Sequence, residues 1–206
     1  MQKMLLFDLD DTLINTHFRH YKVVADFLSL NGKKIEFEEY LQLRRDKNLT
    51  NKELIKKFEP FLANNFNQHW ANCIESEHYL QYDTTIVSPN LLNKLINQGY
   101  ILGIVSLRSN NGNASAQLRN FNWHSYFEKV SFLRHDGQNN PKIKVLEELR
   151  KQYEVAALVG DAITDKQAAG ETAVPFYGVR TGFYKSDASF SFNHVNEFIF
   201  EFLKKS

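Results

Sequence analysis

The chain has 206 residues, of which 43% are hydrophobic and 24% charged, and its formal net charge at pH 7 is +1. This length and apolar share suffice for one large domain, or for a core domain with a smaller inserted one. A net charge so close to zero excludes a global basic field, so neither nucleic acid nor a membrane is expected as a partner.

The compartment is predicted from cysteine usage and from the pattern of apolar runs. The single cysteine, Cys73, excludes an internal disulfide framework and is typical of a reducing compartment. The start of the chain lacks the charged region, apolar region and cleavage site of a signal peptide, and no apolar run is long enough to span a membrane. We therefore expect a soluble, cytoplasmic protein.

The first predicted element is a buried strand that ends in acids. Residues 4–7 are apolar and lead into Asp8 and Asp10, and the hydroxyl residue Thr12 follows. A short apolar run with a polar end is typical of a strand in a parallel sheet, and such sheets bind ligands beyond the carboxyl ends of their strands. Two carboxylates there are costly to desolvate without a cation. The segment indicates a metal-assisted active site, although the acids are also compatible with capping of the next turn.

The next segment is predicted to be helical throughout. Apolar residues at helical spacing indicate helices over 17–31 and 36–45. Thr50 followed by Glu53 predicts a capping box at the start of a third helix, which Pro60 interrupts. A last apolar stripe predicts a fourth helix through Phe66, Trp70, Cys73 and Ile74.

From about residue 84 onward, strands and helices are predicted to alternate. The strands expected after the first are 100–106, 129–133, 155–159, 174–179 and a sixth that includes Phe190 and Phe192. The expected helices are 88–99, 114–120, 141–153, 162–169 (stopped by Gly170) and 193–205, and 107–113 is expected to be a polar loop. This alternation predicts the α/β class, a Rossmann-like, doubly wound parallel sheet with helices on both faces.

The spacing of the first two strands predicts an insertion. They are separated by about 85 residues, far more than a crossover between parallel strands requires. We therefore expect a core domain of residues 1–15 and 84–206, and an α-helical cap domain of residues 16–83 inserted after the first strand, over the active edge of the sheet.

A second acidic segment follows the strand 155–159. Asp161 comes directly after Gly160, and Asp165 lies four residues later. In a helix that starts here, the two carboxylates point the same way and are close enough to share a cation. The alternative is that Asp161 only caps the helix and Asp165 is an exposed charge.

Together these segments resemble the haloacid dehalogenase (HAD) superfamily of phosphohydrolases. The Asp8-x-Asp10-x-Thr12 motif resembles the first signature of that superfamily, and Asp161 and Asp165 with the preceding glycine resemble the fourth. On the family's pattern, Asp8 is the nucleophile and a metal ligand. Asp10 is the general acid and base, and its backbone carbonyl is a further metal ligand. Asp161 binds the metal directly, and Asp165 either binds it or holds its water. An Asp-rich site without His or Cys ligands suits Mg²⁺.

The two weaker signatures lie between these acids in the expected order. Ser106 ends the predicted second strand, where the family places a Ser or Thr that binds the phosphoryl group. The third signature requires a lysine near the start of the helix before the fourth strand. Lys142 is preferred because it occupies the first turn and leaves the apolar residues for the core, and Lys144 remains the alternative.

The residues expected to bind the substrate lie in or next to the predicted site: Thr12, Ser106, Leu107, Arg108, Lys142 and His20. Backbone N–H groups after the first two strands are expected to bind phosphoryl oxygens. Arg108 could contact a second anionic group of the substrate or be a surface charge. For His20, a solvated first helical turn is an equally good interpretation.

The resemblance implies Mg²⁺-dependent hydrolysis of a small phosphorylated metabolite, through an aspartyl-phosphate. The position of the predicted cap is similar to that in the phosphoglycolate phosphatase and β-phosphoglucomutase branch. Asp10 favours phosphoryl transfer, because haloalkanoate dehalogenases of the superfamily do not use this acid. Two alternatives remain open, a phosphomutase and a non-catalytic protein that binds a phosphate ligand on the same scaffold. The chain could be a monomer or a homodimer.

Overall fold

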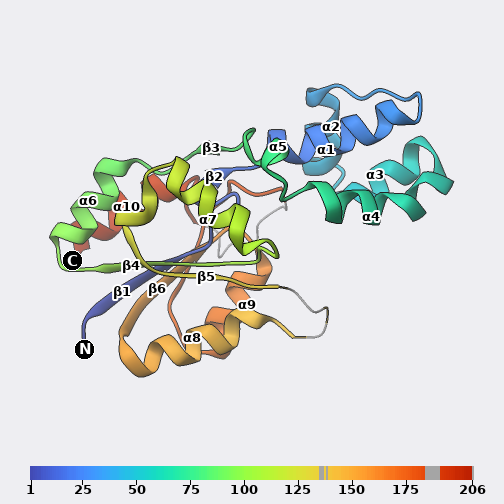
Figure 1. Cartoon of the computed structure of the whole chain (residues 1–206). Helices are drawn as coiled ribbons and strands as arrows, with labels where there is room; N and C mark the ends of the chain where they lie inside the picture. Colours follow the sequence, from blue (N-terminus) through green and yellow to red (C-terminus); the bar gives the residue numbers. More distant parts are fainter. Residues whose placement is uncertain (135–136, 138, 184–190, 206) are drawn as a thin grey trace. The chain divides into compact units, whose positions relative to one another are not determined.

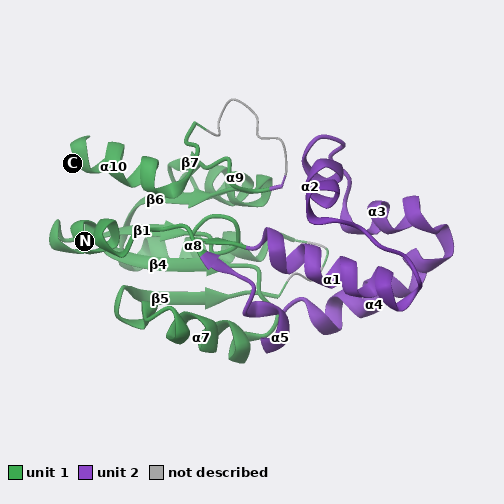
Figure 2. Cartoon of the chain, turned by 90° about the horizontal axis from the view of Figure 1, so that it is seen from above, with its two compact units in different colours: residues 1–15, 85–182, 186–206 green, residues 16–84, 183–185 purple. Residues whose placement is uncertain are grey.

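The computed structural model describes residues 1–134, 137, 139–183 and 191–205, which form two compact units (Figures 1 and 2). Among these residues, unit 1 comprises 1–15, 85–182 and 191–205. Unit 2 comprises 16–84 together with Phe183. The predicted core domain included residue 84 and Phe183, both of which cluster with unit 2.

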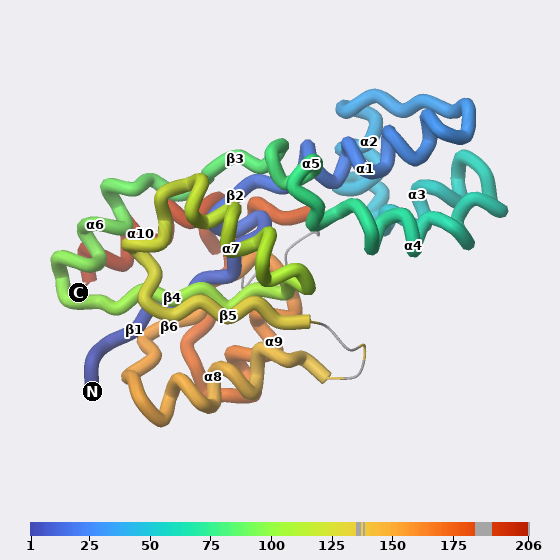
Figure 3. The backbone as a smooth tube through the Cα atoms, in the orientation of Figure 1, coloured from blue at the N-terminus to red at the C-terminus, as the bar shows by residue number. Residues whose placement is uncertain are grey.

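Unit 1 contains a parallel sheet of five strands in the order β5-β4-β1-β6-β7, as labelled in Figure 2, and Figure 3 traces the backbone through it. The strands are β1 (Lys3–Phe7), β4 (Ile101–Ser106), β5 (Phe127–Phe132), β6 (Glu154–Gly160) and β7 (Phe176–Gly178). Each lies within two residues of a strand predicted from the sequence. The central strand β1 is hydrogen-bonded to β4 on one side and to β6 on the other.

Helices cover both faces of this sheet, because alternate residues of β1 point to opposite sides. Leu5 and Phe7 belong to the core cluster that includes residues of α6, α7 and α10, whereas Met4 and Leu6 pack with α8 and α9. All four side chains are fully buried. The helices of unit 1 are α6 (Pro89–Asn97), α7 (Asn111–Asn120), the short η2 (Trp123–Ser125), α8 (Pro141–Gln152), α9 (Ile163–Glu171) and α10 (Val195–Lys205). The predicted doubly wound parallel α/β fold is confirmed.

Unit 2 is helical and has a hydrophobic core of its own. Its helices are α1 (His17–Leu30), α2 (Phe37–Arg45), α3 (Asn51–Phe58), the short η1 (Pro60–Leu62), α4 (Ala63–Cys73) and α5 (Glu77–Leu80). The Thr50–Glu53 capping box at the start of α3 is present as predicted. Two-residue strands pair where the chain leaves and re-enters unit 1, β2 (Ile14–Asn15) and β3 (Thr84–Thr85).

Two helix ends differ from the prediction. Helix α7 begins within the predicted loop 107–113, because the Asn110 side chain accepts a hydrogen bond from the N–H of Asn113 (3.0 Å) and caps the helix early. Helix α9 continues through Gly170, which therefore does not stop it. Ala173 instead adopts the left-handed conformation (φ 51°) just after this helix.

The predicted sixth strand is not formed by the residues that the structure describes there. Phe192 makes only an isolated bridge with Val179, and Phe190 lies outside the described residues. Within the described ranges, none of the helices has the length and apolar character needed to cross a membrane.

Two leucines on α1 provide a matched test of the unit 2 core. Leu28 is fully buried in that core, whereas Leu30 is 78% exposed. We expect Leu28→Ala to lower the free energy of unfolding of unit 2 by about 2–5 kcal/mol, because it removes buried methyl groups and leaves a cavity. Leu30→Ala is the control and should change it by less than about 0.5 kcal/mol. Urea titrations followed by circular dichroism measure both, and equal losses would contradict this assignment of the core.

Candidate active site

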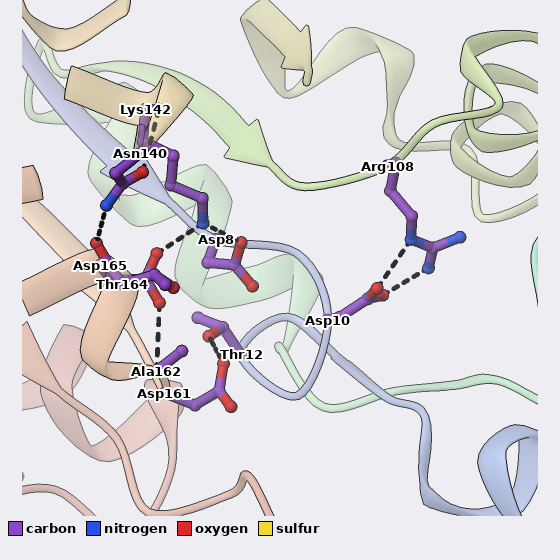
Figure 4. Close-up of polar contacts among 10 residues, drawn as sticks. All are labelled: Asp8, Asp10, Thr12, Arg108, Asn140, Lys142, Asp161, Ala162, Thr164 and Asp165. Carbon is purple, nitrogen blue, oxygen red and sulfur yellow. Dashed lines mark hydrogen bonds and ion pairs between the residues drawn. The ribbon is translucent and has the colours of Figure 1, made fainter. Parts of the chain in front are cut away.

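The acids of the two sequence motifs lie together at the carboxyl end of the central strands (Figure 4). Asp8 follows β1, and its backbone N–H donates to the carbonyl of Val159 in β6 (2.8 Å). Asp161 follows β6, and Asp165 lies in the first turn of α9. Adjacent parallel strands thus bring residues that are far apart in the chain to one edge of the sheet.

The ammonium group of Lys142 lies between two of these carboxylates. Its Nζ atom is 2.5 Å from Oδ1 of Asp8 and 2.5 Å from Oδ1 of Asp165. Only 2% of the Lys142 side chain is exposed, whereas Lys144 is exposed to solvent. Of the two candidate lysines, the structure therefore places Lys142 in the site.

Asn140 holds this lysine in place by joining the starts of two helices. Its side-chain oxygen accepts from the N–H of Lys142 (3.1 Å), which caps α8. Its amide nitrogen donates to the carbonyl of Thr164 in α9 (2.6 Å). The role of Asn140 was not predicted, although an Asn before a proline at the start of a helix is a recognisable N-cap signal.

Three acids form a cluster that could hold a metal ion. Asp8, Asp161 and Asp165 each offer one carboxylate oxygen, and these oxygens lie within 4.8 Å of one another. The hydroxyl of Thr12, expected to bind substrate, donates to Oδ1 of Asp161 (3.1 Å). The N–H of Ala162 donates to Oδ2 of Asp165 (3.1 Å). These hydrogen bonds orient two of the three carboxylates.

Two glycines give the carboxylates room. A Cβ atom at Gly160 would overlap the carboxyl group of Asp165, and one at Gly182 would overlap the carboxyl group of Asp161. Neither glycine has a positive φ, so space rather than backbone conformation requires a glycine at these positions. The cluster depends on this close approach of backbone and side chain.

Burial makes the cluster hard to ionise. It raises the pKa of Asp8 to about 7, although Lys142 acts in the opposite direction. Burial and the neighbouring acids raise the pKa of Asp161 well above its ordinary range. Burial alone would lower the pKa of Lys142, but Asp165 and Asp8 outweigh it and hold that pKa above its usual value. Three carboxyl groups thus face one ammonium group, an arrangement that favours a further cation.

Asp10 faces a different partner. Its carboxylate points away from the cluster toward Arg108 (Figure 4). The guanidinium group donates from Nε to Oδ2 of Asp10 (2.7 Å) and from Nη2 to Oδ1. The Nη2 atom also donates to Oε1 of Gln117 (3.4 Å). Arg108 was expected at the mouth of the site but is only 1% exposed, whereas the Asp10 side chain is 29% exposed.

The remaining predicted residues lie in two places. Ser106 ends β4 and is buried, and Leu107 follows it and is half-buried. His20 belongs to α1 of unit 2, where its ring stacks on Phe183 (5.4 Å between centroids) and meets Trp70 edge to face (5.0 Å). The predicted site residues of unit 1 therefore lie at one edge of the sheet, whereas His20 belongs to unit 2.

The segment after β7 was not predicted to take part in the site. The Thr181 hydroxyl donates to the carbonyl of Asp11, a residue held in the left-handed conformation (φ 54°) that Asp tolerates better than most residues. Gly182 lies against Asp161. A Thr-Gly pair directly after a predicted parallel strand was the available signal, since this strand ends at the same edge of the sheet.

The family model for haloacid dehalogenase-like hydrolases matches residues 5–179, from β1 to just beyond β7. The chain belongs to this family. The resemblance noted in the sequence is thereby confirmed. None of the curated proteins matches the chain.

Solved structures show the same fold over nearly the whole chain. A HAD-superfamily hydrolase of subfamily IA, variant 1, from Geobacter sulfurreducens PCA is 17% identical, with a TM-score of 0.71 over 98% of this chain and 96% of that chain. A haloacid dehalogenase-like family hydrolase from Streptococcus pneumoniae is 15% identical (TM-score 0.70, 100% and 98% covered). A protein described as a predicted phosphoglycolate phosphatase from Haemophilus somnus 129pt is 18% identical (TM-score 0.64, 98% of both chains).

The acidic cluster fits the metal that this family generally uses, Mg²⁺. Its donors are carboxylate oxygens, which a small hard cation prefers. Its negative charge exceeds what Lys142 compensates within the cluster, and Gly160 and Gly182 leave the carboxyl groups space to converge.

Gly182→Ala is expected to weaken Mg²⁺ binding by about 10- to 100-fold, the effect typical of disturbing the groups that support a metal ligand. The added methyl group would displace the Asp161 carboxylate. Gly170→Ala is the control, because a Cβ atom there would meet nothing within 4 Å. Isothermal titration calorimetry with Mg²⁺ measures both variants, and equal affinities would show that Gly182 does not support the cluster.

Mg²⁺ affinity is expected to rise with pH between about 6 and 8. The raised pKa of Asp8, about 7, means that a proton occupies this ligand at lower pH and competes with the cation. Below that pKa the affinity should fall by up to about tenfold per pH unit. Asp8→Asn should weaken the dependence without removing it, because the pKa of the second ligand, Asp161, is raised as well. A wild-type affinity that does not change with pH would contradict the assignment.

Proposed function

We propose that the chain is a Mg²⁺-dependent phosphatase that hydrolyses a small phosphorylated metabolite through an aspartyl-phosphate on Asp8. The observation that supports it most strongly is the Lys142 ammonium, 2.5 Å from the carboxylates of both Asp8 and Asp165. A carboxylate that attacks a phosphate ester brings two negative groups together, so the reaction requires fixed positive charge beside the nucleophile. Lys142 supplies such a charge within a buried site.

In the first half-reaction, a carboxylate oxygen of Asp8 attacks phosphorus, and the bond from phosphorus to the leaving oxygen breaks. Asp10 donates a proton to the leaving alcohol. Lys142 and the Ser106 hydroxyl bind the phosphoryl oxygens. The contacts of Lys142 with Asp8 and Asp165 hold its ammonium group where the transferred charge arrives.

In the second half-reaction, water attacks the phosphorus of the aspartyl-phosphate. Asp10, now a carboxylate, takes a proton from that water, and the bond from phosphorus to Asp8 breaks. Inorganic phosphate leaves, and both carboxyl groups return to their starting forms. One acid therefore serves as general acid and then as general base, which requires it to be reachable by solvent, and the Asp10 side chain is 29% exposed.

The cation would be held by the carboxylates of Asp8, Asp161 and Asp165 and by the backbone carbonyl of Asp10. When bound, Mg²⁺ would neutralise phosphoryl oxygens and orient them for in-line attack. The Thr12 hydroxyl would orient one of these ligands, because it donates a hydrogen bond to the Asp161 carboxylate.

Unit 2 is proposed to be the cap expected from the sequence. It has a hydrophobic core of its own, and it is inserted in the chain directly after the loop that carries Asp8 and Asp10. Substrate selectivity is proposed to come from unit 2, with His20 as a candidate contact, and from Leu107 at the end of β4.

Asp8→Asn tests the proposed reaction. With Mg²⁺, the wild type should release phosphate from members of a panel of phosphorylated metabolites and from para-nitrophenyl phosphate. The variant should lose about a thousandfold or more of this activity, because it lacks the nucleophile. Asp46→Asn is the matched control, since Asp46 is exposed in unit 2 and should be dispensable. Malachite green detection of phosphate measures all three proteins.

Either of two results would overturn this proposal. Full activity of Asp8→Asn would exclude the aspartyl-phosphate. Conversion of a sugar phosphate to a bisphosphate by the wild type, without net phosphate release, would instead identify a phosphomutase.

A further inference from the structure

We propose that Arg108 is a positioning residue for Asp10, and that it acts mainly in the hydrolysis of the aspartyl-phosphate. This inference rests on the proposed function and assigns Arg108 a role other than the substrate contact expected from the sequence. Its basis is the paired geometry in which the guanidinium group donates to both carboxylate oxygens of Asp10. Such a two-point pair fixes the rotation of the carboxyl group as well as its position.

Arg108 is itself held through both its backbone and its side chain. At the end of β4, the backbone N–H of Arg108 donates to the carbonyl of Ser106 (3.2 Å), which forms a tight turn. At the side chain, Gln117 of α7 accepts from Nη2 and is buried. Asp10, Arg108 and Gln117 thus form a chain of hydrogen bonds that runs from the rim of the site into the core.

The geometry assigns this chain to the second half-reaction. Both oxygens of Asp10 accept from a cation, so the group is held as the carboxylate that must take a proton from water. In the first half-reaction Asp10 must carry a proton, and this two-point pairing cannot persist. Arg108 should therefore contribute most to hydrolysis of the intermediate.

Pre-steady-state kinetics with para-nitrophenyl phosphate and Mg²⁺ separates the two half-reactions. Para-nitrophenol is an acidic leaving group, so its departure depends little on proton donation by Asp10. In Arg108→Met we expect kcat to fall by about 10- to 100-fold, the effect of a misplaced catalytic group. Because the aspartyl-phosphate then accumulates, a burst of para-nitrophenol should approach one equivalent per active site.

Three further variants sharpen the test. Arg119→Met is the matched control, because Arg119 is exposed on α7 and should show wild-type kinetics. Arg108→Lys keeps the charge but loses the two-point pairing, so its burst should be intermediate. Gln117→Leu leaves Asp10 and Arg108 in place and removes the acceptor of the Arg108 Nη2 hydrogen bond, so it should give a smaller burst in the same direction even if Arg108→Met does not fold.

The outcomes distinguish this inference from the proposed function. If the wild type is active and Asp8→Asn is not, but the Arg108 and Gln117 variants lower kcat without a burst, the inference is wrong and the phosphatase assignment stands. A raised KM with an unchanged kcat in Arg108→Met would also overturn the inference and make Arg108 a substrate contact. Retention of full activity by Asp8→Asn would overturn the proposed function instead.

Discussion

Compensation of buried negative charge is the constraint on which this site depends. Asp8, Asp161 and Asp165 converge at the carboxyl edge of the sheet, where the burial of Asp8 and Asp165 makes their ionised forms costly. The Lys142 ammonium offsets part of that cost by contacting Asp8 and Asp165 at once. Asn140 joins the starts of α8 and α9 by hydrogen bonds, and this places the lysine beside the acids.

Two separate charge pairs at one sheet edge take different parts in the proposed mechanism. The Lys142 pair holds a compact point charge beside the proposed nucleophile, Asp8. Arg108 presents a flat fork to Asp10, and this fork sets the orientation of the carboxyl group. Although Asp8 and Asp10 are only two residues apart, the carboxylate of Asp8 lies beside Lys142 and that of Asp10 points toward Arg108 (Figure 4). The same residue type can thus take two roles because its cationic partners differ.

The hydrophobic core of unit 2 also combines residues that are far apart in the chain. Phe183, from the far end of the chain, is buried there between the rings of His17 (4.1 Å between centroids) and Tyr40 (5.9 Å). The guanidinium group of Arg44 lies 4.5 Å from the centre of the Phe183 ring. Gly182, the preceding residue, belongs to unit 1, where it lies against Asp161.

The amino-acid sequence by itself determined the order and type of most elements and the acids of the site. Apolar runs that end in Asp8, Ser106 and Asp161 identified three strands of the sheet, because the burial of both faces of a parallel sheet is visible in a short window of sequence. Helix periods and the Thr50 capping box were equally local signals. The predicted start of α7 was wrong because the Asn110 side chain caps that helix early. The predicted end of α9 was wrong because the left-handed residue after the helix is Ala173 and not Gly170.

Only the tertiary structure decided which partner each charged side chain meets. The pairing of Asp10 with Arg108, the choice of Lys142 over Lys144 and the packing of Gly182 against Asp161 all depend on the strand order β5-β4-β1-β6-β7. That order places the ends of β4, β1, β6 and β7 side by side, although they are far apart in the chain. Local periodicity reports which face of an element is buried, whereas side-chain contacts depend on which elements become neighbours when the sheet and its helices pack.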